Sequence, residues 1–346
     1  MYIYLLILNI VFGQVEFENP ISKGKLTHSK LKEISGLERS SLHDIIWSHN
    51  DSGGKGIIYG LNDSGKIICN LILKDINNRD WEDISYGFIE GKNYIFVGDI
   101  GDNDKTYQTK YIYYFEEPLN LKDTIIINDV NRIEFKYPTS NYDSECLMFD
   151  PISKDLIVIS KRETNEKVFS ISYPYNNNDI VIAEYKTELK IGSSDNLLSW
   201  VTAGDISEDG KHILIKNYTN VYYWERGTDL YNTLNGSGQD IVNYKLASEP
   251  QGESICWEDN ISGFYTVSEE VFGITPEIKY FKKKEIINGV DKKSLNDIKF
   301  DDVNFRFYDL IGNIYSYNEY LNSQNNMYIV LDLKNFKSIK LLRHKF

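Results

Sequence analysis

The sequence predicts an all-β protein, and three observations support this. The 346 residues include 26 Tyr and 16 Phe but only 3 Met, and aromatic residues are enriched in strands. No segment keeps an apolar residue at every third or fourth position, so few helices are expected. Short strand-like runs, separated by clusters of Asn, Asp, Gly and Ser, continue instead from about residue 20 to about residue 283.

One pattern recurs among these runs: an acidic residue stands just ahead of a short apolar segment. The acids are 48 to 63 residues apart, a period typical of propellers and other repeat arrays. We therefore interpret each segment as the innermost strand of a blade, with the acids around a central channel. They need not all face it, because Asp205 stands one place before Ile and Glu82 two places. The five acids are Glu33, Glu82, Glu145, Asp205 and Glu253.

Each repeat supplies three or four predicted strands. These are 33–37, 44–48, 57–61 and 66–73; 81–88, 94–99, 111–115 and 132–137; 145–149, 156–161, 168–172 and 180–185; 200–206, 212–217, 221–224 and 241–246; and 253–257, 263–268 and 277–281. The last repeat lacks a fourth strand, so residues 24–28 are expected to pair with it and close the ring. We predict a five-bladed β-propeller. Six blades are the alternative, because the second and third intervals have room for further strands.

The two ends of the chain differ from this body. Residues 2–12 are almost wholly apolar and too short to span a membrane, which favours a signal peptide over residues 1–14, although no Lys or Arg precedes them. A buried N-terminal strand is the alternative. The propeller is expected over 20–284. After a charged connection, residues 296–346 form either a small β-sandwich-like domain or one more blade.

The charge balance bears on the partners of the chain. Lys and Arg number 38 against 51 Asp and Glu, a net charge of −13, which disfavours nucleic acid and anionic membranes and suits cations. We expect a monomer with no membrane span in the mature chain. Cys69, Cys146 and Cys256 lack metal-type spacing, and the latter two lie in apolar strands, where a free Cys behaves as a small buried hydrophobe.

Oxygen ligands dominate the expected site at the channel mouth. Calcium binds six to eight oxygens and is the first choice, with magnesium second; the five His are not paired at the spacing that zinc requires. Alternatively, the acids pin one blade to the next through ion pairs or bonds to backbone amides. Crowded carboxylates need a cation, or Lys161 and Arg162, to neutralise them. The expected metal ligands are Glu82, Asp83, Asp99, Glu145, Asp205 and Glu253.

Two residues are expected to be catalytic, His49 and Asp51. His49 stands between a strand and the turn Asn-Asp-Ser-Gly, where an imidazole could act as a base near neutral pH or simply bond the turn. Gly101 is interpreted as a turn residue, because no helix follows it. The expected substrate-binding residues are Asn50, Asp102, Asn103, Lys161, Arg162 and Glu269.

Two parts of the chain resemble known families. The segments WSHNDSG (47–53), DWEDI (80–84), VGDIGDN (97–103), DSECLMFDP (143–151), ISKR (159–162), GDISEDG (204–210) and EPQGESICW (249–257) resemble a bacterial family of secreted or periplasmic β-propellers of mostly uncharacterised function. The wider group is similar to phytase-like and lactonase-like propellers, which hold calcium in or near the channel. The C-terminal segments 305–317, 325–333 and 338–346 resemble the type IX secretion sorting domain of Bacteroidetes, although the usual Pro-Asn-Pro entry is missing and Asn326-Met327 stand where Gly is usual.

The resemblances imply a protein that is secreted or at the cell surface and engages the type IX secretion machinery. We expect a calcium-type ion in the acidic channel and hydrolysis of phosphoesters or lactones, with the metal as Lewis acid. The alternative is a non-catalytic propeller that binds a small molecule or an extracellular polymer, with a structural ion or none. Fold by itself does not decide between them.

Overall fold

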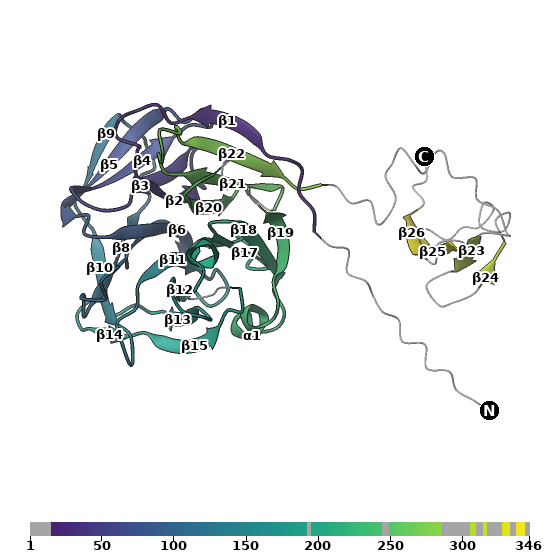
Figure 1. Cartoon of the computed structure of the whole chain (residues 1–346). Coiled ribbons are helices and arrows are strands. Elements are labelled where there is room, and N and C mark those ends of the chain that lie inside the picture. Colours follow the sequence, from purple (N-terminus) through teal and green to yellow (C-terminus); the bar gives the residue numbers. More distant parts are fainter. Residues whose placement is uncertain are drawn as a thin grey trace. The chain divides into compact units, whose positions relative to one another are not determined.

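Five sheets radiate around a common axis in the computed structural model, as predicted, and their strands pair antiparallel except for one outer strand in each of two sheets (Figure 1). The structure describes residues 15–191, 195–243, 249–259 and 261–284, together with C-terminal strands between 305 and 342. The six-bladed alternative is wrong, because the strands of residues 17–283 form five sheets. Helices are few, as expected: the described residues contain only α1 (Leu230–Asn235) and a short 3-10 turn at Leu197–Ser199.

The blades follow one another along the chain. From the inner to the outer strand, blade 1 is β2 (Ile34–Arg39), β3 (Ile46–Asn50), β4 (Lys55–Leu61), β5 (Ile67–Asn77) and β9 (Thr124–Ile127). Blade 2 is β6 (Trp81–Ile89), β7 (Lys92–Asp99), β8 (Lys110–Glu116), β10 (Asn131–Lys136) and β14 (Val181–Ile182). Blade 3 is β11 (Ser144–Phe149), β12 (Leu156–Ser160), β13 (Lys167–Ile171) and β15 (Glu184–Glu188).

The last two blades complete the ring. Blade 4 is β16 (Val201–Ile206), β17 (His212–Asn217), β18 (Asn220–Glu225) and β19 (Gln239–Asn243). Blade 5 is β20 (Gly252–Trp257), β21 (Gly263–Ser268), β22 (Glu277–Lys282) and β1 (Ile21–Lys25). An N-terminal strand therefore pairs with the last blade, as predicted, because β1 lies antiparallel to β22, although it spans Ile21–Lys25 where residues 24–28 were expected. This pairing gives blade 5 its fourth strand and covers an edge that would otherwise be open.

The long second and third intervals do contain extra strands, but these extend existing blades. Strand β9 adds to β5 in parallel, and β14 adds to β10 in parallel. The single strand predicted at 180–185 is therefore wrong. Its first part is β14 of blade 2, its last part begins β15 of blade 3, and Ala183 between them is fully buried.

The hydrophobic core lies mainly between successive blades. Phe96 and Phe149 stack between blades 2 and 3 with ring centroids 5.6 Å apart, and Trp47 and Trp81 share the cluster between blades 1 and 2. All six residues of β11, β16 and β20 are buried, so these inner strands contact neighbouring blades instead of water. Cys146 and Cys256 are buried, as expected, Cys69 is buried as well, and none of the three forms a disulfide.

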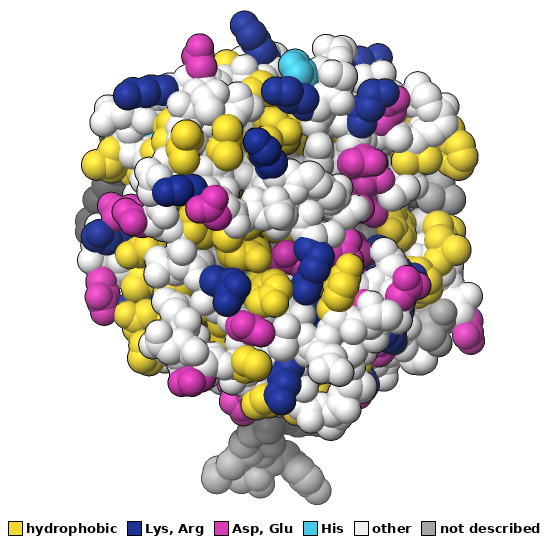
Figure 2. All heavy atoms as spheres, turned by 90° about the vertical axis from the view of Figure 1, so that its left-hand side faces the viewer, with side chains coloured by type: hydrophobic (Ala, Val, Ile, Leu, Met, Phe, Trp, Pro, Cys, Tyr) yellow, Lys and Arg dark blue, Asp and Glu magenta, His cyan; other side chains and the backbone are white. Residues whose placement is uncertain are grey.

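Other regions add little to the site. The strands β23 (Phe305–Tyr308), β24 (Ile314–Tyr315), β25 (Met327–Asp332) and β26 (Lys337–Leu342) form a separate four-stranded sheet in the order β24-β23-β25-β26. The proposed signal peptide, residues 1–14, lies outside the described residues. Among the described residues, no helix has the length and apolarity needed to cross a membrane. Figure 2 shows basic side chains interspersed with acidic ones on one face of the molecule.

Candidate metal centre at the start of the inner strands

Each inner strand has an irregularity near its beginning, where one residue is left out of the ladder with the next strand. A bulge of this kind bends the strand and re-aims its side chains. Acids occupy it in blades 2, 3 and 5 only. The acid Glu33 instead precedes β2 and is exposed, and Asp205 lies further along β16, so these two are not equivalent to the others. The five bulge residues are Gly36, Glu82, Glu145, Thr202 and Glu253.

Carboxylates from three blades meet at Glu82. Its oxygens belong to two groups of three, one with Asp51 and Asp80 and the other with Asp143 and Glu145, and the ligand atoms within each group lie within 4.8 Å of one another. We call these five residues the entry cluster, because they lie where the inner strands begin. Glu82, Asp143 and Glu145 are buried, whereas Asp51 and Asp80 are partly exposed.

Gly101 allows the carboxylates to approach the backbone. A Cβ atom at this position would lie 1.9 Å from Glu82 Oε1 and 2.7 Å from Asp80 Oδ2, so any other residue would displace both side chains. The turn Gly101-Asp102 therefore shapes the wall of the entry cluster, which is more than the turn role that the sequence predicts.

Two basic residues neutralise part of the cluster. Lys161 bonds Glu145, and Arg162 bonds Asp143. Glu145 keeps a pKa raised to about 8, chiefly because burial disfavours its charged form. Burial likewise raises the pKa of Glu82 well above its usual value, and repulsion from Glu145 adds to this.

Asp51 combines a perturbed pKa with a free oxygen. Burial, with a further contribution from Glu253, raises its pKa to about 7. Its Oδ1 has no hydrogen-bond partner within the part of the chain that the structure describes. Asp51 lies just past the end of β3, and its backbone oxygen accepts the N–H of Trp81, which ties it to the start of β6.

Glu253 and Glu269 extend the acidic region toward blade 5. Glu253 accepts hydrogen bonds from Tyr218 Oη at 3.0 Å and Gln251 Nε2 at 3.2 Å. The pKa of Glu269 is raised to about 9, first by burial and then by Glu253 and Asp51. The charges of Glu253 and Glu269 therefore act on the entry cluster through Asp51. The hydroxyl group of Tyr218, which bonds Glu253, was not predicted from the sequence.

His49 is buried and belongs to neither carboxylate group. Its Nδ1 lies 2.8 Å from the backbone oxygen of Asn50, and its ring packs edge-on against Trp81 with centroids 5.6 Å apart. Burial lowers its pKa to about 4. His49 is thus neutral at pH 7 and sits between blades, where no exposed face is available to a substrate.

The remaining residues expected to bind substrate or metal are held by structural contacts. Asp102 forms a buried ion pair with Lys110 at 2.8 Å and accepts two backbone N–H groups of its own loop. Asp99 pairs with Arg79 at 2.9 Å, and burial raises its pKa to about 6. Asn50 Nδ2 donates to the backbone oxygen of Lys30 at 2.9 Å, and the exposed Asn103 bonds Arg162.

Asp83 and Asp205 lie deeper in the ring and bond the backbone of the following blade. Asp83 Oδ2 accepts the N–H of Leu147 at 2.9 Å, and Asp205 Oδ2 accepts that of Trp257 at 2.7 Å. Glu38, which the sequence did not single out, likewise accepts the N–H of Tyr86 at 2.9 Å. For these acids the structure shows contacts that pin one blade to the next, which was the alternative to metal binding.

Asp80 and Asp143 were not predicted as site residues, although a sequence pattern could have indicated them. Each precedes a bulge glutamate by two residues, in the repeated pattern Asp-x-Glu at the start of β6 and β11. That repetition places a second acid just before each of these two inner strands.

Sequence comparisons identify no relative: no protein-family profile matches the chain, and no curated protein matches it. Among solved structures the similar folds are β-propellers. A luciferin-regenerating enzyme is 8% identical with a TM-score of 0.42, covering 76% of this chain and 95% of that one. The propeller domain of Cps50 (Swd1) from Myceliophteria thermophila is 12% identical with a TM-score of 0.39, covering 78% and 99%. A gluconolactonase from Xanthomonas campestris is 8% identical with a TM-score of 0.41, covering 79% and 98%. The five sheets of the chain itself make it a five-bladed β-propeller, and its activity has to be argued from its own residues.

Proposed function

We propose that this propeller is a metal-dependent hydrolase of phosphoesters or lactones, with a divalent cation bound by the entry cluster. The observation that carries the proposal is the position of Glu82, whose carboxylate belongs to two groups of three acidic side chains at once. Calcium is the first candidate and magnesium the second.

The donor set fits calcium. Two oxygens that bind one calcium ion at about 2.4 Å can lie at most about 4.8 Å apart, which is the limit within which each group falls. The donors are carboxylates from three different blades, and calcium accepts such irregular oxygen sets. Glu82, Asp51 and Asp80 form the more open group, and Glu82, Asp143 and Glu145 the more buried one.

The chain's own residues supply the remaining chemistry. A bound divalent ion polarises a phosphoryl or carbonyl oxygen as a Lewis acid. Asp51, whose Oδ1 has no hydrogen-bond partner in the part of the chain that the structure describes, is placed to take the proton of an attacking water. The attack breaks the ester bond to the leaving oxygen, which then takes up a proton. Tyr218 and Gln251 donate hydrogen bonds to Glu253 and so fix the position of its carboxyl group.

A second candidate function is non-catalytic binding of an extracellular ligand. It is favoured by Lys161 and Arg162, which already neutralise Glu145 and Asp143 and leave fewer charges for an ion. Under this proposal the ion is structural or missing, and the acids mainly hold the blades together.

We also propose, from residues 1–14 and the C-terminal segment, that the chain is exported by the type IX machinery and acts as a monomer outside the cell. The apolar run at 2–12 and the sequences of the C-terminal strands support this.

Calorimetric titration of the chelator-treated protein with calcium tests the metal centre. We expect saturable binding that Glu82→Gln weakens by at least about 100-fold, as expected for loss of a group at a metal site. Asp129→Asn is the matched control, because this exposed acid lies on the loop before β10 and its loss changes the net charge equally.

Hydrolysis assays then separate the two functions. p-Nitrophenyl phosphate and a δ-lactone are offered with calcium, with magnesium and with chelator. Activity that needs the ion and is lost in Asp51→Asn supports the hydrolase. Calcium binding without hydrolysis of either substrate supports the binding propeller. Activity that survives both chelation and Glu82→Gln would contradict the metal-hydrolase proposal.

A further inference from the structure

A cavity of about 860 Å³ lies at the other end of the channel, where the inner strands finish. Its wall is built by residues from the ends of all five inner strands, among them Glu38, Tyr86, Phe149, Asp205 and Trp257. The entry cluster lies where the same strands begin, so the cavity is a separate place on the ring. Its volume is within the range of small-molecule sites.

The cavity carries an excess of acidic side chains. Glu38, Asp205, Glu208, Glu258 and Asp259 all line it. Within the described residues none of these five forms an ion pair with a Lys or Arg, because the basic residues nearby pair with other acids. Arg39, whose guanidinium lies in the wall, is already paired with Asp44 and Asp63.

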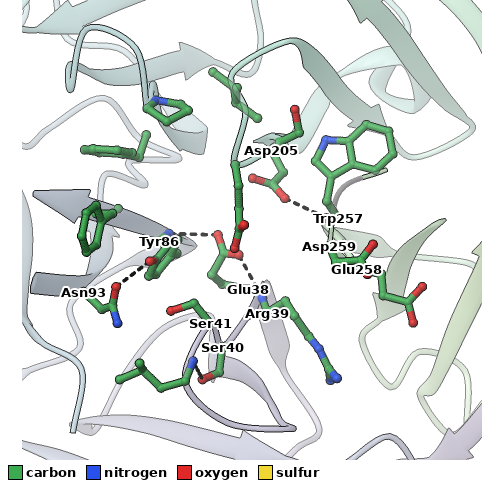
Figure 3. Close-up of a pocket in the computed structure, with 18 of the residues that line it drawn as sticks. Glu38, Arg39, Ser40, Ser41, Tyr86, Asn93, Asp205, Trp257, Glu258 and Asp259 are labelled. Carbon is green, nitrogen blue, oxygen red and sulfur yellow. Dashed lines mark hydrogen bonds between the residues drawn. The ribbon is translucent and has the colours of Figure 1, made fainter. Parts of the chain in front are cut away.

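The acids at the centre are held in fixed positions. Glu38 accepts the N–H groups of Arg39 and Tyr86, each at 2.9 Å, and Asp205 accepts that of Trp257 (Figure 3). In this view Glu38 extends toward the centre of the cavity, with Tyr86 on one side and Asp205 and Trp257 on the other. Bonds to backbone keep these carboxyl groups in place without adding positive charge.

Aromatic side chains complete the wall. Phe88, 56% exposed, and Phe149 come from blades 2 and 3, and Trp257 comes from blade 5. Aromatic faces attract ammonium groups and pack against aliphatic chains. They offer no oxygen ligands, and a bare metal ion with its oxygen shell would fill only a small part of this volume.

We infer that this cavity binds an organic cation that carries two or more ammonium groups on an aliphatic chain. The carboxyl groups bind the ammonium groups, and the aromatic wall packs against the methylene groups. This inference is independent of the proposed function, since it uses no residue of the entry cluster.

Calorimetric titration of the full chain with spermidine tests the inference, with fully acetylated spermidine as the neutral comparison. We expect saturable one-to-one binding of spermidine only. The double variant Glu208→Gln/Asp259→Asn, which changes two exposed rim acids, should weaken binding at least about fivefold. Ser41→Trp fills the cavity from its exposed loop without changing charge and should abolish measurable binding.

Asp129→Asn, which removes one exposed charge, serves as the charge control and should leave spermidine affinity unchanged. The inference is overturned if acetylated spermidine binds equally well, if Asp129→Asn weakens binding by as large a factor per charge removed as the double variant does, or if Ser41→Trp, folded by circular dichroism, binds as the parent does. The second of these outcomes would show general attraction to a chain of net charge −13.

Discussion

The carboxylate of Asp83 on the inner strand of blade 2 accepts the backbone N–H of Leu147 on the inner strand of blade 3, at 2.9 Å. Its other oxygen accepts the N–H of Ile84 at 3.0 Å. One buried side chain thus satisfies two backbone donors and joins two blades at the channel wall. Asp205 repeats the arrangement between blades 4 and 5.

Asp83→Ala should therefore destabilise the propeller. It leaves two buried N–H groups without an acceptor, at a cost of about 1–3 kcal/mol for each. Urea unfolding, followed by tryptophan fluorescence, measures the loss. Asp209→Ala removes an exposed acid from a turn and should cost much less. Equal unfolding midpoints for the two variants would show that the contact between blades contributes little.

Asp205 should make stability depend on pH. Burial raises its pKa to about 7 from the usual 3.8, so between these values the folded state binds the proton more tightly than the unfolded state. Stability is then fully present below about pH 4 and falls as the pH rises to about 7. Asp205→Asn keeps an oxygen for the N–H of Trp257 but cannot titrate. The fall in unfolding free energy from pH 4 to 7, measured with chelator present, should be smaller in this variant; an unchanged slope would contradict the assignment.

Gly101→Ala should impair the metal centre without a change of charge. The added methyl group collides with Glu82 and Asp80, so calcium affinity should fall by about 10- to 100-fold, as when groups that orient metal ligands are disturbed. Gly227→Ala is the control, because a Cβ there meets only Thr233 Oγ1 at 3.4 Å. Calorimetry compares the two variants. Parental calcium affinity in Gly101→Ala would place the ion elsewhere.

Lys161→Met tests how the chain neutralises its acids. Without the ammonium group, Glu145 loses its buried ion-pair partner, and breaking such a pair costs about 3–5 kcal/mol. The melting temperature in chelator should therefore drop. Calcium should restore more stability to this variant than to the parent, because binding to the folded state adds stability by mass action. If the melting temperature of Lys161→Met is the same with and without calcium, the result would argue against the metal centre.

Deletion of residues 15–25 tests closure of the ring. It removes β1 and exposes the edge of β22, whose backbone groups pair with β1 in the complete chain. An unpaired edge recruits other strands, so the truncated protein should unfold more easily and self-associate. Size-exclusion chromatography with light scattering compares it with the parent. A truncated chain that stays monomeric and equally stable would show that β1 is dispensable.

The architecture was largely predictable because its signals are local. Alternating aromatic strands and polar turns repeat along the chain, and the spacing of the acids indicated five blades. The N-terminal strand that closes the ring was predictable from the number of strands, because the sequence of blade 5 supplies only three. The strand predicted at 180–185 failed because a single apolar run was divided between two sheets around the buried Ala183. Only the packing of the blades decides that β14 joins the edge of blade 2 and β15 the edge of blade 3.

The site was predicted only in part. The sequence by itself determined that Glu82, Glu145 and Glu253 start inner strands, and that acids outnumber bases. Tertiary structure decided which acids meet, because bulges and blade packing set the direction of each side chain. It brought Asp51, Asp80 and Asp143 to Glu82, buried His49 between blades, and sent Asp83 and Asp205 to backbone amides of the next blade. Adjacent acids such as Glu82 and Asp83 thus differ in role, since a one-residue shift along a strand reverses the face on which a side chain lies.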